Sequence, residues 1–180
     1  MMLDGQPTPD SPVWVSLLER LRQELGPDTR LVFPRTWTEQ HTIWFHKIES
    51  ESFRAELRYS DREIMERLER PKSMAMFVVT EEQPEAVLLG YPLGESTTRK
   101  FYLDTMAVMK RGRGLGRLIL QTLIDWLKNQ GYTSLQLDTE EFNEIGIPLV
   151  SFYTKLGFAV LSQDKTGNVS MELVLRPLVS

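Results

Sequence analysis

The chain has 180 residues, 41% of them hydrophobic and 26% charged, which is enough to build one domain with a core of its own. Its formal net charge of −4 argues against a nucleic-acid binder held by a broad basic surface. It contains no cysteine, which excludes disulfides, thiolate metal sites and a cysteine nucleophile, and its two histidines are too few for a three-histidine metal site. We therefore expect neither a bound metal nor a nucleic-acid partner.

The N-terminal region predicts a tail and then a helix. Residues 1–10 are polar and carry prolines, which is typical of a loose tail without an export signal. No apolar stretch approaches the ~18 residues needed to cross a bilayer, so we expect a cytoplasmic protein without a membrane partner. Ser11-Pro12 offers an N-cap, apolar residues follow at helical spacing, and Gly26-Pro27 ends the run.

Strand-like and helical stretches alternate along the rest of the chain, and hairpins join some strands while helices join others. This order predicts an α/β fold with a mixed sheet. The expected elements, in chain order, are a strand at 31–33, helices over 38–53 and from the capping pair Ser60 and Glu63 to Pro71, strands at 75–80, 86–91 and 100–109, a helix over 114–130, a strand at 132–139, a helix from Pro148 to Gly157, and a hairpin of 158–161 with 169–175.

A glycine-rich basic segment stands between the strand at 100–109 and the long helix. Gly112, Gly114 and Gly116 leave the backbone bare, and four of the eight residues 110–117 are basic. The N–H groups of the first helical turn have no partner inside the helix, so together with the helix dipole they favour a bound anion. The segment therefore predicts a phosphate site, or else a tight turn with solvated arginines.

Two common phosphate motifs do not fit this segment. A dinucleotide fingerprint needs a third glycine where Arg117 or Ile119 stands, and it belongs to a first βαβ unit rather than to a loop past mid-chain. A P-loop needs Gly-Lys-Ser/Thr after four spacer residues, which is absent.

The spacing R-x-x-G-x-G, formed by Arg111, Gly114 and Gly116, resembles the acyl-CoA pyrophosphate loop of the GNAT family of N-acetyltransferases. Residues 151–158, with Tyr153 followed by Gly157-Phe158, resemble the late helix of the same family. The resemblance covers roughly residues 30–176. It implies an acetyltransferase domain at 30–180, preceded by a tail and an extra helix at 1–29.

The resemblance implies a mostly antiparallel sheet in which two central parallel strands, 100–109 and 132–139, splay apart around acetyl-CoA. The pantetheine would pair with exposed backbone from Asp104 to Met106. Asn143 stands near the position of a family asparagine that contacts the pantetheine, although Gly146 occupies the matching place and the loop is about three residues longer. The remaining expected cofactor-binding residues are Arg111, Gly112, Arg113, Gly114, Leu115, Gly116 and Arg117.

The implied reaction is direct transfer of an acetyl group to an amine, without a covalent enzyme intermediate. The amine must lose a proton, which requires a base, and the departing thiolate benefits from an acid. Tyr153 matches the family's acid, or it is an ordinary core residue. Asp138 and Asp104 are the candidate bases, or each is a solvated or capping charge.

The acceptor and the partners stay open at this point. The acidic loop after Asp138 could recognise a cationic amine or be merely solvated. An apolar wall on the acceptor side could be formed by residues of the early segment, although such residues more often belong to a core: Trp37, Trp44, Phe45 and His46. A catalytically silent acyl-CoA-binding module is the alternative function. The extra helix could cover the domain's own surface or that of a second copy, so a homodimer is also open.

Overall fold

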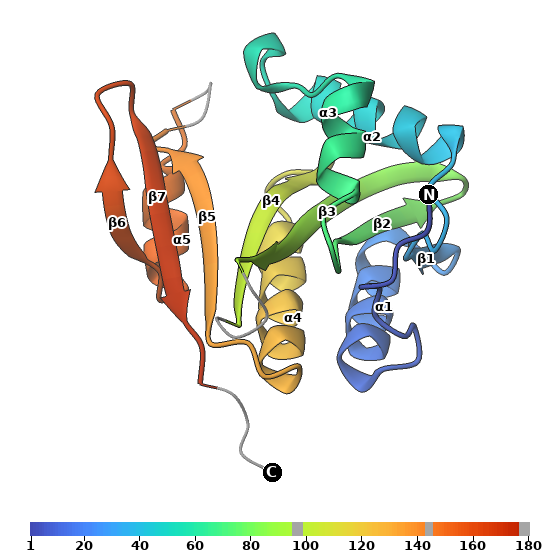
Figure 1. Cartoon of the computed structure of the whole chain (residues 1–180). Helices are drawn as coiled ribbons and strands as arrows, with labels where there is room; N and C mark the ends of the chain where they lie inside the picture. Colours follow the sequence, from blue (N-terminus) through green and yellow to red (C-terminus); the bar gives the residue numbers. More distant parts are fainter. Residues whose placement is uncertain (95–98, 143–145, 177–180) are drawn as a thin grey trace.

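The computed structural model describes residues 1–94, 99–142 and 146–176, and it has the element order that the sequence predicts (Figure 1). The helices are α1 (Pro12–Leu25), α2 (Glu39–Ser52), the 3-10 helix η1 (Ala55–Leu57), α3 (Asp61–Leu68), α4 (Leu115–Asn129) and α5 (Leu149–Lys155). The strands are β1 (Thr29–Val32), β2 (Met74–Thr80), β3 (Gln83–Leu93), β4 (Lys100–Val108), β5 (Ser134–Glu140), β6 (Ala159–Gln163) and β7 (Asn168–Val174).

The strands form one seven-stranded sheet in the order β1-β2-β3-β4-β5-β7-β6. Among the described strands β4 and β5 are the parallel neighbours, and all other pairs are antiparallel. Parallel pairing joins residues 100–103 to residues 134–137, whereas β4 continues to Val108 and β5 to Glu140. The two strands therefore pair at their beginnings and separate beyond, which confirms the expected splayed pair (Figure 1).

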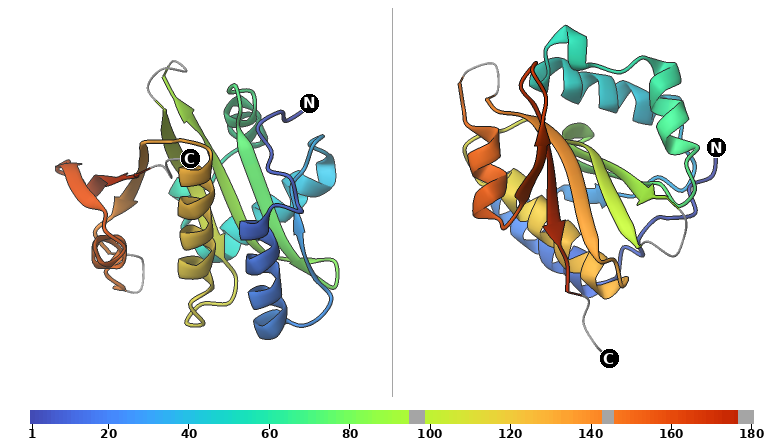
Figure 2. Two further views of the ribbon diagram at one scale, coloured as in Figure 1. Left: turned by 90° about the horizontal axis from the view of Figure 1, so that it is seen from below. Right: turned by 60° about the vertical axis from the view of Figure 1, so that its left-hand side comes forward.

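The sheet is covered on both faces, which explains why β2 is an almost unbroken apolar run. Its alternate residues Met74, Met76 and Val78 pack with α1 and α4, and Ala75, Phe77 and Val79 pack with α2 and α3. Figure 2 shows α1 and α4 side by side on one face, with α2 on the other. Trp37, Trp44 and Phe45 are at most 8% exposed in the second of these clusters, so they are core residues rather than an acceptor wall.

The N-terminal residues are packed, so the expectation of a loose tail is wrong. The Leu3 backbone N–H donates to the Arg35 carbonyl at 2.7 Å, and the Leu3 side chain is buried. The Gln6 side chain donates to the Pro34 carbonyl at 2.8 Å and accepts from the Ala75 N–H at 3.1 Å. These hydrogen bonds tie the segment to residues far along the chain, where local sequence patterns cannot reveal them.

Helix α1 covers the chain's own surface. Trp14, Leu17 and Leu21 are fully or almost fully buried, and they belong to the core cluster that α4 shares. The Trp14 ring meets the Phe33 ring edge-on at a centroid distance of 5.1 Å. Its apolar face therefore needs no second copy to cover it.

Local signals place α3 as expected. The Ser60 side chain accepts from the Glu63 N–H, and the Glu63 side chain accepts from the Ser60 N–H, which forms the predicted capping box.

Within the described ranges, no helix is both long and apolar enough to cross a membrane.

Candidate active site

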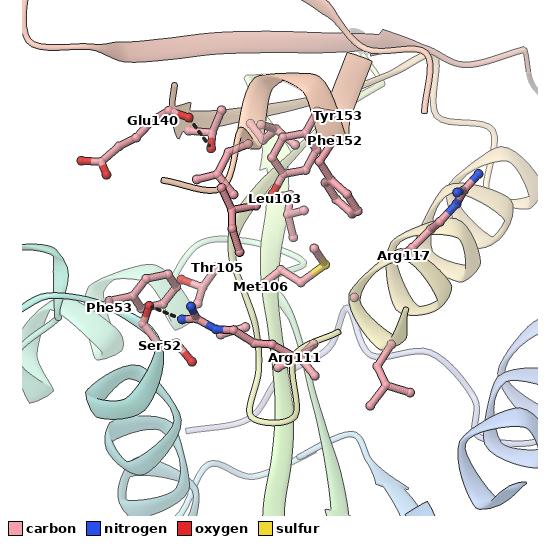
Figure 3. A pocket seen from close by; sticks show the side chains of 18 of the residues that line it. Ser52, Phe53, Leu103, Thr105, Met106, Arg111, Arg117, Glu140, Phe152 and Tyr153 are labelled. Atoms are coloured by element: carbon pink, nitrogen blue, oxygen red, sulfur yellow. Dashed lines mark hydrogen bonds between the residues drawn. The ribbon is translucent and has the colours of Figure 1, made fainter. Parts of the chain in front are cut away.

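A pocket of about 510 Å³ lies where β4 and β5 separate (Figure 3). This volume is in the range of small-molecule and cofactor sites. Its walls come from β4, from the glycine-rich loop with the first turn of α4, from β5, from α5, and from the end of α2 with η1. The pocket thus brings together segments that are far apart in the sequence, from Ser52 to Asn168.

The glycine-rich loop forms one end of the pocket, as the sequence predicts. Gly112 and Gly114 have φ values of +80° and +72°, a region that disfavours other residues, and Gly114 is the N-cap of α4. No side chain caps this helix, so its first-turn N–H groups are open to a ligand. Gly116 differs, because a Cβ there would meet only Val108, at 3.7 Å, so nothing in the protein requires a glycine at this position.

The basic side chains of the loop differ in their partners. Arg111 donates to the Ser52 carbonyl at 3.2 Å and Arg113 to the Glu24 carbonyl at 3.2 Å. Lys110 lies 3.5 Å from the Glu85 carboxylate. Arg117 is exposed on the first turn of α4, and within the part of the chain that is described no hydrogen bond or ion pair joins it to a protein group. Leu115 is buried beside these residues and closes the pocket floor.

On the β4 side, Thr105 and Met106 line the pocket beyond the last residue paired with β5 (Figure 3). The β4 backbone that faces β5 is therefore not used by the sheet along this stretch. An extended ligand could pair with it as a further strand would. Asn143, the other residue expected to bind the pantetheine, lies outside the described residues.

Tyr153 projects from α5 into the pocket beside Phe152 (Figure 3). Its ring packs against Phe158 at a centroid distance of 5.6 Å, so it also contributes to the core. Burial raises the pKa of Tyr153 to about 12, so the hydroxyl keeps its proton at neutral pH. Within the described residues no hydrogen bond engages this hydroxyl, which leaves the proton available to a ligand.

Asp138 stands on β5 one residue beyond the last parallel pair, and it lines the pocket. Its Oδ2 accepts a hydrogen bond of 2.5 Å from the Tyr102 hydroxyl, and its Oδ1 accepts one from the Ser170 hydroxyl. The side chain is exposed. Both of these partners are uncharged hydroxyls, and within the described residues no ion pair neutralises the Asp138 carboxylate.

Asp104 has a different environment, because it occupies a β-bulge. Leu89 pairs with Thr105 while Gly90 pairs with Leu103, so Asp104 is the extra residue of β4. Its side chain is 4% exposed and lies 3.1 Å from the Arg67 Nε. The hydroxyls of Tyr59 and Tyr91, each at 2.7 Å, and of Thr105, at 3.0 Å, also donate to its carboxylate.

Several pocket residues lie on segments that sequence patterns did not single out. Ser52, Phe53 and Leu57 form the wall opposite β5, and the Ser52 hydroxyl is buried without a hydrogen-bond partner in the described structure. Arg54, next to this wall, forms an ion pair with Glu140 at the end of β5. No local signal marks these residues, because the fold alone brings them to the pocket.

Comparison with known proteins identifies the fold. The sequence model described as the acetyltransferase (GNAT) family matches residues 20–158. The chain belongs to this family. It is 35% identical over 75 residues to N-alpha-acetyltransferase 30 of Schizosaccharomyces pombe. That alignment covers 41% of the chain and 48% of the relative, so the match spans about half the length of this curated protein.

Solved GNAT structures share the architecture at low identity. The ribosomal-protein-S18-alanine N-acetyltransferase from Escherichia coli aligns with a TM-score of 0.65 at 16% identity, covering 84% of this chain and 96% of that one. An aminoglycoside 6'-N-acetyltransferase complexed with coenzyme A gives 0.66 at 14% identity, with 84% and 99% covered. The PaiA N-acetyltransferase from Thermoplasma acidophilum, also complexed with coenzyme A, gives 0.60 at 16% identity, with 81% and 99% covered. At these identities the similarity shows the fold alone, and the names of these enzymes give acceptors as different as a ribosomal protein and an aminoglycoside.

Proposed function

We propose that the protein transfers an acetyl group from acetyl-CoA directly to a primary amine of a small molecule or a peptide. One observation carries this proposal. A single pocket joins an uncapped basic helix N-terminus, the unpaired backbone of β4, the protonated hydroxyl of Tyr153 and the carboxylate of Asp138.

The cofactor end of the pocket suits acetyl-CoA. The N–H groups of residues 112–117 and the Arg117 guanidinium would hold the pyrophosphate, since charge and open donors converge there. The β4 edge from Asp104 to Met106 would pair with the amides of the pantetheine arm. Two structurally similar acetyltransferases, which were solved in complex with coenzyme A, support this assignment.

Acetyl-CoA supplies an acetyl thioester, and the side chains of the pocket move the protons. As the new C–N bond forms and the C–S bond breaks, Asp138 would accept the amine proton, directly or through water. Tyr153 would donate a hydrogen bond or a proton to the departing sulfur. A phenol is a weaker acid than a thiol, so Tyr153 contributes mainly by stabilising the developing thiolate.

We assign the role of base to Asp138 rather than to Asp104. The Asp104 carboxylate is buried, paired with Arg67 and surrounded by three hydroxyl donors, so a proton on it would break established hydrogen bonds. Asp138 is exposed to the pocket and bonded to two hydroxyls, which can reorient. Asp104 then serves to fix the bulge of β4.

A cationic acceptor is favoured by the charges of the lining. Three carboxylates line the pocket, Asp104, Asp138 and Glu140. Arg67 neutralises Asp104 and Arg54 neutralises Glu140, whereas the hydrogen-bond partners of Asp138 are neutral hydroxyls. An amine that arrives as an ammonium would therefore be attracted to the same carboxylate that takes its proton.

The experiment is a thermal melt followed by a transfer assay. A ligand that binds only the native state raises the melting temperature, so millimolar acetyl-CoA should raise it while NAD and ATP should not. Free thiol should then appear only when an amine from polyamine, aminoglycoside or peptide pools is added. Protection without thiol release in any pool would favour the silent acyl-CoA-binding module, and protection by NAD or ATP but not by CoA would favour a nucleotide-binding domain.

A further inference from the structure

A cluster of charged side chains outside the pocket joins α2 to α3. His46 of α2 lies between two carboxylates, with its Nδ1 2.6 Å from Glu49 Oε1 and its Nε2 2.5 Å from Asp61 Oδ1. A neutral imidazole has a single N–H and can donate to only one of them. Both contacts together therefore require the protonated ring.

Glu49 connects this cluster to the pocket wall. Its side chain is 4% exposed, and its second oxygen accepts from the Tyr59 backbone N–H at 3.0 Å. The Tyr59 ring stacks on Phe45, and its hydroxyl donates to Asp104 on the bulge of β4. A chain of hydrogen bonds thus runs from His46 through Glu49 and Tyr59 to the strand that lines the pocket.

The same cluster fixes the segment 53–60, which links α2 to α3. The Glu49 carboxylate accepts a hydrogen bond from the backbone N–H of Tyr59, which belongs to this segment. The His46 ring contacts the carboxylate of Asp61, the first residue of α3. Phe53 and Leu57 of the segment form the pocket wall opposite β5. The position of that wall therefore depends on contacts made outside the pocket.

We propose that His46 and Glu49 are positioning residues that hold the segment 53–60 as the acceptor-side wall, and that the wall loosens when His46 loses its proton. This inference rests on the proposed function, since it takes that wall to face the acceptor. Neither residue lines the pocket, so both act through Tyr59 and the segment.

The pH dependence follows from the groups that act on the ring. Burial alone would lower the pKa of His46, but the hydrogen bonds and charges of Asp61 from α3 and of Glu49 from its own helix outweigh it and raise the pKa above 6.5. Below the ordinary pKa of histidine the ring of His46 is charged and holds both carboxylates. This double contact is lost as the pH rises through the raised pKa of His46. The wall should therefore be ordered in mildly acidic solution and looser in alkaline solution.

Amide hydrogen exchange of the free protein tests this directly, because it needs no substrate. Protection of residues 53–60, corrected for the intrinsic pH dependence of exchange, should fall several-fold between pH 6 and pH 8.5. In His46→Gln, which has no charge and one side-chain nitrogen in place of the two ring nitrogens that contact the two carboxylates, protection at pH 6 should already be at the level that the wild type has at pH 8.5. Glu49→Gln should show the same loss of protection. If this variant of a buried residue does not fold, the result for His46→Gln decides the test.

His41→Asn is the matched control, since His41 lies on the same helix and its Nδ1 contacts the backbone N–H and the hydroxyl of Thr38 instead of a carboxylate. It should keep the wild-type pH dependence. With an acceptor found by the transfer assay, KM for the amine should rise with pH in the wild type while binding of acetyl-CoA stays unchanged. Equal protection at both pH values, or an unchanged profile in His46→Gln, would overturn the inference, whereas failure of the proposed function would leave the exchange result intact.

Discussion

Tyr102 on β4 donates a hydrogen bond of 2.5 Å to Asp138 on β5, across the place where the two strands stop pairing. Burial, and then the bond and charge of Asp138, raise the pKa of Tyr102 well above its usual value, so the phenol remains a donor at neutral pH. Tyr102 thereby fixes the orientation of the Asp138 carboxylate at the vertex of the pocket.

Asp138→Asn removes the proposed proton acceptor while it keeps the shape of the side chain. We expect kcat/KM for the amine to fall by about 10²- to 10⁴-fold, the usual contribution of a general base. Initial rates of thiol release at a fixed pH measure this. Asp125→Asn, an exposed position on α4, is the control. Equal kcat/KM in Asp138→Asn and the control would assign the base elsewhere.

Tyr153→Phe removes the pocket hydroxyl that we propose as the donor to the departing sulfur. Since the pKa of Tyr153 is raised to about 12, the loss should be the same at every pH from 6 to 9. We expect kcat to fall by about 10²-fold or more, while protection by acetyl-CoA in a thermal melt stays unchanged. Tyr132→Phe is the control, because it makes the same change at a residue that precedes β5 and does not line the pocket; it should leave kcat unaltered. If Tyr153→Phe had the kcat of the wild type, the role of Tyr153 would be structural only.

Gly116→Ala and Gly114→Ala should separate ligand binding from folding. At Gly116 a Cβ contacts only Val108, so the variant should fold normally and lose affinity for CoA, because the methyl enters the space beside the phosphates. Gly114 has a φ of +72°, so alanine there should cost about 1 kcal/mol of stability or more. Melting curves and CoA titrations of both variants decide this. Unchanged CoA affinity in Gly116→Ala would show that the cofactor does not approach this turn.

Trp14→Ala tests whether α1 is an integral part of the core. The ring is fully buried against Phe33 and Trp126, so its removal should cost about 3–5 kcal/mol. Urea unfolding of Trp14→Ala measures the loss, with the exposed Val15→Ala as the control on the same helix. A cost below 1 kcal/mol, roughly the level of a surface substitution, would mean that the helix is dispensable to the fold.

The order of elements could be predicted because its signals are local. The capping box of Ser60 and Glu63, the glycines around α4 and the apolar run of β2 each depend on neighbouring residues. The basic, glycine-rich loop before α4 could be predicted in the same way, since its charges and its glycines are contiguous in the sequence. The separation of the two parallel strands was predicted from the family resemblance.

The environment of each carboxylate could not be predicted, because it depends on contacts between distant segments. Asp104 and Asp138 have similar places on neighbouring strands, but a bulge in β4 turns the first toward Arg67. The wall formed by Phe53 and the ion pair between Arg54 and Glu140 likewise join residues that no pattern links. The packing of Leu3 onto the sheet has the same cause.

The central claim, direct transfer to an amine, is tested most directly by measuring both products in one reaction. The protein is incubated with acetyl-CoA and pooled primary amines, and free thiol and acetylated amine are quantified together by colorimetry and mass spectrometry. We predict that both appear in equal amounts, that neither appears without protein, and that no acetylated protein accumulates. Protection of the protein by acetyl-CoA with no acetylated amine from any pool, or transfer by way of an acetylated side chain, would contradict this claim.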